Sequence, residues 1–96
     1  MSIKINVHVR DQMFQVVCGQ GNQKVRWLSD VALHRYEHFH SSDPGLAKGM
    51  RFEDGNLLNM DYAICDNEKL LEHDVHVWVI LKEDLALMEA ESAKEM

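Results

Sequence analysis

The chain has 96 residues, of which 46% are hydrophobic and 27% are charged, and its formal net charge is −6. This length predicts one domain, and the apolar share argues against a disordered chain. The negative charge disfavours nucleic acid as a partner, and no apolar run approaches the roughly 20 residues of a membrane helix, so we expect no membrane insertion. Met1 to Lys4 show no secretory signal, which predicts a cytoplasmic protein.

The first 22 residues predict a β-hairpin followed by a loop. Apolar residues alternate with polar ones over residues 5–9, which is typical of a half-buried strand. After a short turn at residues 10–12, Phe14, Val16 and Cys18 are expected to face the core, whereas Met13, Gln15 and Val17 face outward. The glycines of residues 19–22 end the second strand.

From Lys24 to His40 the apolar spacing changes to three and four residues, which predicts one amphipathic helix. Asn22 is the better candidate for its N-cap, because a side-chain oxygen there can accept a backbone N–H bond. Residues 41–45 contain Pro44 and Gly45 and predict a loop.

The second half predicts three further strands around an irregular segment. Residues 50–52 and 57–58 are expected to form short strands on either side of a turn at residues 53–55, and residues 60–71 to hold one helical turn at most. Residues 75–81 are apolar on both faces, which indicates a central strand.

This order, β-β-α-β-β-β, predicts an α+β fold with one helix across a mixed sheet whose first and last strands are adjacent. That arrangement is the ubiquitin-like β-grasp. We expect the domain to span residues 1–81, and residues 82–96, which are acidic and rich in alanine, to form a frayed helix or a disordered tail.

No catalytic or cofactor site is predicted. Residues 19–24 lack the spacing and the Gly-Lys-Ser/Thr ending of a phosphate loop. His34 and His38 share a helix face, but two surface ligands without a third make a weak metal site. Cys18 and Cys65 are expected to be reduced thiols rather than nucleophiles. We therefore expect that the protein is not an enzyme and that it binds neither a metal nor a cofactor.

Charge is distributed unevenly along the chain. Residues 1–52 contain seven lysines and arginines against four acidic residues, whereas residues 53–96 contain three lysines against twelve acidic residues. Such polarity favours association between complementary surfaces, although charge runs are also common on plain solvated faces. The candidate basic face comprises Lys4, Arg10, Lys24 and Arg26. The candidate acidic face comprises Asp61, Asp66, Glu68 and Asp74, and the outward Met13 and Val17 are a possible apolar contact.

Two blocks of sequence resemble a known family. The first is Val17-Cys18-Gly19-Gln20-Gly21 with the helix that follows it, and the second runs from Asp54 to Asp61 and on to Ile64-Cys65-Asp66. Both resemble the amino-terminal domain of the partitioning-defective-three, or Bazooka-type, cell-polarity scaffolds. The resemblance covers Lys4 to about Ile80.

The resemblance implies a fold similar to the Phox-and-Bem-one domain and front-to-back assembly into filaments. It also implies a scaffold at the cell cortex or cell junctions that gathers atypical protein kinase C and its polarity adaptor. Lys4 and Lys24 match basic positions of the family pattern, and Asp61 and Asp66 match acidic ones. Asp11 and Met13 stand where arginines are common, Gln15 replaces an apolar residue, and Lys69 dilutes the acidic run.

These observations predict head-to-tail self-association in which one copy's basic face binds the next copy's acidic face. The alternative is a ubiquitin-like adaptor domain that binds other proteins and stays monomeric. The hypothesis assumes that the two charged faces lie on separate sides of the fold.

Overall fold

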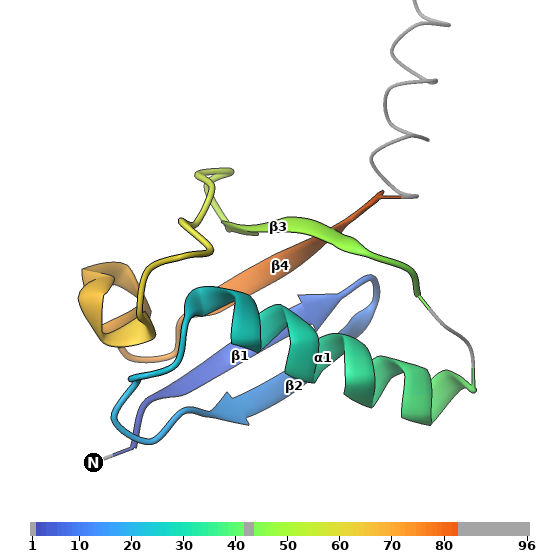
Figure 1. Cartoon of the computed structure of the whole chain (residues 1–96), viewed down its shortest axis with the longest axis horizontal. Helices are drawn as coiled ribbons and strands as arrows, with labels where there is room; N and C mark the ends of the chain where they lie inside the picture. Colours follow the sequence, from blue (N-terminus) through green and yellow to red (C-terminus); the bar gives the residue numbers. More distant parts are fainter. Residues whose placement is uncertain (1, 42–43, 83–96) are drawn as a thin grey trace, which may run out of the picture.

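The structure is a computed structural model that describes residues 2–41 and 44–82, in which one long helix lies across a four-stranded sheet (Figure 1). Its elements in chain order are β1 (Lys4–Val9), β2 (Gln12–Val17), α1 (Val25–His40), β3 (Ala47–Phe52), the 3-10 helices η1 (Ile64–Asp66) and η2 (Glu68–Leu71), and β4 (His76–Leu81). The predicted α+β fold is confirmed. The predicted acidic tail lies outside the described residues from residue 83 onward.

The sheet has the strand order β2-β1-β4-β3. β1 is antiparallel to β2 and parallel to β4, and β4 is antiparallel to β3. The first and last strands are therefore neighbours and β4 is central, as the apolar character of both its faces predicted.

One face of the sheet packs against α1 and forms the core. The alternation predicted for the hairpin is confirmed, because Phe14, Val16 and Cys18 are buried while Met13 and Val17 are exposed. The helix contributes Val25, Leu28, Ala32 and Tyr36 to the same core. The other side of the sheet, which we call the open face, carries the alternate side chains of the strands. These are Lys4, Asn6, His8, Met13, Gln15, Val17, Arg51, His76, Trp78 and Ile80.

The helix begins differently from the prediction. Its N-cap is Lys24, which makes no side-chain capping bond, and the predicted cap Asn22 lies outside the helix. Instead, the amide of Val25 donates to the carbonyl of Tyr62 over 2.8 Å, and the amide of Arg26 donates to that of Met60 over 3.1 Å. Backbone carbonyls from a distant segment thus satisfy N–H groups that a side chain was expected to satisfy.

The predicted short strand at residues 57–58 is wrong. Leu57 forms only an isolated bridge with Arg51, and β3 extends further toward the N-terminus than predicted. The register shifts between Ala47 and Gly49, which pair with the neighbouring residues Leu81 and Ile80, so Lys48 is the extra residue of a bulge in this edge strand. The bulge breaks the alternation in the first half of β3, which sequence reasoning did not identify.

Residues 60–65 pack against residues 21–26, and we call this region the corner. Lys24 and Ala63 form a bridge, and the amide of Cys65 donates to the carbonyl of Gly21. Gly21 has a φ of +78°, and a Cβ there would lie 2.7 Å from Ile3 Cδ1 and 3.0 Å from the Cys65 nitrogen. The corner therefore requires glycine both for its backbone conformation and for its close packing.

Candidate interaction surfaces

The four predicted basic residues do not form one continuous face. Lys4 lies at the start of β1 on the open face, opposite Val17 of β2. Arg10 lies six residues further, in the hairpin turn, which places the two about 20 Å apart along an extended strand. Its guanidinium carbon is 5.9 Å from the centroid of the Tyr36 ring. Lys24 and Arg26 lie at the start of α1, at the opposite end of the molecule from the hairpin turn (Figure 1).

One predicted basic residue contacts a predicted acidic residue within the same chain. The guanidinium of Arg26 donates to the carboxylate of Asp61 and forms an ion pair with it. The packing of the corner brings these residues together, because the amide of Arg26 bonds the carbonyl of Met60. The expected separation of the two charged faces therefore does not hold at the corner. Their role in self-association stays a prediction.

The other acidic residues project from η1, η2 and the segment that leads into β4. Leu70 is completely buried, and the Asn67 side chain accepts bonds from the amides of Lys69 and Leu70, which fixes the turn. Four exposed carboxylates result, which we call the acidic segment: Asp66, Glu68, Glu72 and Asp74. Within the described part of the chain, Asp66, Glu68 and Glu72 form no ion pair, and neither does Lys4 or Lys24.

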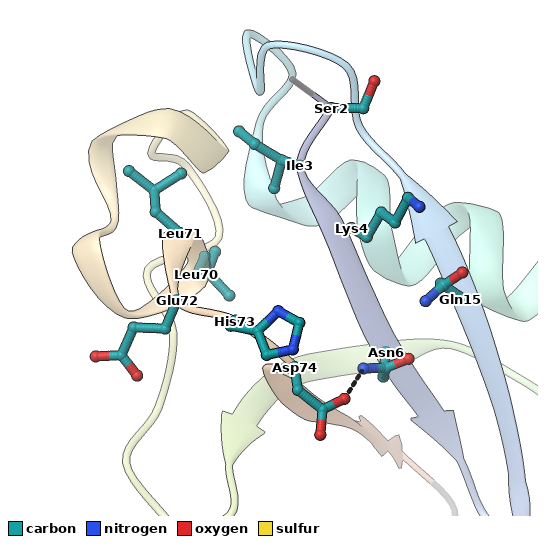
Figure 2. Close-up of a pocket in the computed structure, with 10 residues that line it drawn as sticks. All are labelled: Ser2, Ile3, Lys4, Asn6, Gln15, Leu70, Leu71, Glu72, His73 and Asp74. Carbon is teal, nitrogen blue, oxygen red and sulfur yellow. Dashed lines mark hydrogen bonds between the residues drawn. The ribbon is translucent and has the colours of Figure 1, made fainter.

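Asp74 is held more firmly than the rest of the acidic segment. Its carboxylate accepts a bond of 3.3 Å from the Asn6 amide and lies 3.5 Å from Nε2 of His76. Figure 2 shows Lys4, Asn6 and Gln15 on one wall of a groove and the residues from Leu70 to Asp74 on the other. This groove, of about 470 Å³, therefore carries charges of both signs.

The middle of the open face carries a row of side chains from all four strands, which we call the stacked row: Met13, His8, Trp78 and Arg51. The His8 ring stacks on Trp78 with centroids 4.4 Å apart and an angle of 10° between the planes. The Arg51 guanidinium carbon lies 5.0 Å from the centroid of the Trp78 ring, a cation–π contact. Met13 is paired with His8 across the hairpin and is 50% exposed.

A second histidine contacts the stacked row. Nε2 of His8 and Nδ1 of His76 are 2.8 Å apart. Burial, followed by the proximity of His76 and Arg51, lowers the pKa of His8 below its ordinary value. The neutral form of His8 is therefore favoured, because a positive charge on its ring would be partly buried and would lie beside the His76 ring and the Arg51 guanidinium.

Sequence reasoning missed His8, Trp78 and Arg51 as surface residues of interest. Only His8 stood at a polar position in a predicted alternation, because the strand at residues 75–81 was expected to be apolar on both faces and no facing was predicted for Arg51. Their contact depends on the registers of β1 with β4 and of β4 with β3, which no local pattern specifies. In contrast, the exposure of Met13 and Val17 follows from the hairpin pattern and is confirmed, and their role as an apolar contact stays a prediction.

The thiols and remaining histidines show no arrangement for chemistry in the described residues. Burial raises the pKa of the Cys18 thiol to about 11, so it is protonated at neutral pH. Cys65 is also a free thiol. No group of three or more His, Cys, Asp or Glu side chains within residues 2–41 and 44–82 is placed to hold a metal ion. No helix in these ranges has the length and apolar character needed to cross a membrane.

Comparison with known proteins shows the fold. No protein-family model and no curated protein matches the chain. Several solved structures resemble it, among them the following two. The EccD5 ubiquitin-like domain from Mycobacterium xenopi is 14% identical, has a TM-score of 0.59, and covers 82% of this chain and 92% of that one. A structure described as "Molecular Mimicry of SUMO promotes DNA repair" is 18% identical, has a TM-score of 0.53, and covers 83% of this chain and 91% of that one.

These likenesses confirm the predicted ubiquitin-like β-grasp fold. At sequence identities of 14% and 18%, no activity or binding partner of this chain can be inferred from them. The polarity-scaffold resemblance therefore stays a prediction.

Proposed function

We propose that this chain is a non-enzymatic protein-interaction domain that binds copies of itself head to tail. The observation that carries this proposal is the set of exposed charges without a partner in the described part of the chain. Lys4 and Lys24 supply the cations, and Asp66, Glu68 and Glu72 supply the carboxylates. Opposite fields of this kind speed encounter and fix the register of two docking surfaces.

Several contacts must act together for such an interface to form. A single exposed ion pair contributes only about 0.2–1 kcal/mol, so one Lys–Asp pair cannot hold two copies together. Exposed apolar side chains are available near the charges, including Val17 opposite Lys4, Met13 opposite His8, and Leu71 within the acidic segment. When different patches meet in this way, the assembly keeps a free basic patch at one end and a free acidic patch at the other, so it is open-ended.

The family resemblance supplies the wider setting of the proposal. A parent protein of the Bazooka type would be a cell-polarity scaffold at the cell cortex or cell junctions, and this domain would form its filaments. Atypical protein kinase C and its polarity adaptor would be partners of the parent protein. The fold is compatible with this setting, because Phox-and-Bem-one domains are themselves β-grasp domains.

Sedimentation velocity tests the proposal directly. We expect the wild-type chain to form concentration-dependent assemblies that dissociate as salt is raised, because exposed charge pairs are screened. Lys24→Glu and Asp66→Lys should each reduce assembly, and an equimolar mixture of the two variants should give a one-to-one complex and nothing larger. A wild-type chain that remains monomeric at high concentration and low salt contradicts the proposal.

A second candidate is a monomeric adaptor that binds a different protein. It is favoured by the Arg26–Asp61 ion pair and by the shared groove of Lys4 and Asp74, since both bring opposite charges together within one copy. This candidate predicts a monomeric wild type at every salt concentration in the same experiment.

A further inference from the structure

Besides Lys24 at the corner, the cations that form no ion pair within the described part of the chain include two on the open face, Lys4 and Arg51. Arg26 is ion-paired with Asp61, and Arg10 lies at the far hairpin turn. Arg51, which was not among the predicted residues, lies on the open face. It donates one bond of 3.0 Å to the carbonyl of Phe52 and forms no ion pair within the described part of the chain. Since guanidinium has five N–H donors, others are left for a partner.

The open face combines positive charge with apolar surface. The strand side chains on it include two cations, Lys4 and Arg51, and no carboxylate. The stacked row runs from Met13 on β2, which is 50% exposed, to Arg51 on β3, and both His8 and Arg51 contact the Trp78 ring. Lys4 lies beside this row, four residues before His8 on β1. Aromatic and arginine side chains of this kind are the ones that dominate the energy of protein interfaces.

The acidic segment has the complementary chemistry. It offers the carboxylates of Asp66, Glu68 and Glu72, which form no ion pair with any residue in the described ranges, and Leu71 between them is 49% exposed. In its own chain this segment faces the groove beside Lys4, and neither Trp78 nor Arg51 lines that groove (Figure 2). Asp74 contacts Asn6 and His76 on the open face of its own chain, which leaves Asp66, Glu68 and Glu72 as the carboxylates of this segment that a second copy can meet.

We propose that the acidic segment of one copy docks across the stacked row of the next, so that its carboxylates meet Arg51 and Lys4 while Leu71 packs on Met13 and Trp78. This inference rests on the self-association proposed above and specifies the surface that carries it. The interface contains different patches from the two copies, which keeps the assembly open-ended.

Charge reversal on two sides of one strand tests the inference. Arg51→Glu reverses a cation on the open face, whereas Lys48→Glu, three residues away on β3, reverses one that lines a groove on the helix side. We expect Arg51→Glu to lower the association constant at least tenfold in sedimentation experiments, and Lys48→Glu to change it less than twofold. Met13→Glu, at a half-exposed position, should also lower the association constant severalfold. This variant replaces Arg51→Glu as the test if Arg51→Glu disturbs the fold.

A mixing experiment and NMR complete the test. Arg51→Glu has an intact acidic segment and Glu72→Lys has an intact stacked row, so their mixture should give a one-to-one complex. On dilution of the wild type, the Trp78 indole and Arg51 amide signals should shift, whereas the Lys48 amide signal stays fixed. If the wild type self-associates and neither Arg51→Glu nor Met13→Glu changes its association constant, this inference is overturned while the proposed function stands. A wild type that is monomeric under all conditions overturns both.

Discussion

The two faces of the sheet hold their side chains by different means. On the helix side, Ile5, Val7 and Val77 are completely buried in the core. On the open face, His8, His76 and Trp78 are only half-buried and are ordered by stacking and by one nitrogen–nitrogen contact of 2.8 Å. The comparison teaches that the first face sets the stability of the domain, whereas the second presents pre-ordered groups to a partner.

Truncation on the two faces should separate their contributions most strongly. Leu28→Ala removes a completely buried side chain from the helix side and should lower the free energy of unfolding by about 2–5 kcal/mol. Ile80→Ala removes a half-buried side chain from the open face and should cost about 1 kcal/mol. Urea denaturation measures both, and equal losses would contradict the assignment of the core to the helix side.

Glycine replacements should show how tightly the corner is packed beneath the helix. Gly21→Ala forces a side chain into a positive φ and against Ile3 and Cys65, so we expect a loss of about 2–4 kcal/mol. Gly19→Ala is the matched control, because Gly19 also has a positive φ of +58° but has no atom within 4 Å of the added Cβ. It should cost about 1–2 kcal/mol, from backbone strain alone. If thermal unfolding gives the same loss for both, the close packing at Gly21 contributes nothing.

Protonation of His8 on the open face should lower the free energy of unfolding at acidic pH. The pKa of His8 is lowered in the folded state by burial, by His76 and by Arg51, so the unfolded chain binds a proton there more readily. This contribution to stability is present above the ordinary pKa of 6.5 and is lost as pH falls through the folded pKa. His8→Asn should flatten the dependence of unfolding free energy on pH between 7.5 and about 5. The exposed helix residue His34, replaced by Asn, is the control and should leave the slope unchanged.

The smallest expected effect is at the Arg26–Asp61 ion pair. Both side chains are more than half exposed, so a double-mutant cycle with Arg26→Ala and Asp61→Ala should give a coupling of about 0.2–1 kcal/mol that falls as salt is added. A larger, salt-insensitive coupling would mean that the pair is a structural part of the corner.

The fold could be predicted from the sequence because its main signals are local. The alternation in residues 5–18 and the change to a helical period after residue 24 identify the hairpin and α1, and the double-sided apolar run identifies β4. The surfaces depend on contacts that span the chain. The pairing of Arg26 with Asp61 and the stacking of His8 on Trp78 each join residues far apart in sequence, so charge counting treated Arg26 and Asp61 as available and overlooked Arg51.

The bonds at the start of α1 have a consequence for the order of folding. The first backbone amides of this helix donate to the carbonyls of Met60 and Tyr62, which follow more than thirty residues later in the chain. Closing so long a loop costs entropy before any bond is gained, so we expect this turn to consolidate after the transition state while the β1–β2 hairpin forms early. Substitutions at Val25 should then speed unfolding and leave the refolding rate nearly unchanged, which stopped-flow kinetics can measure.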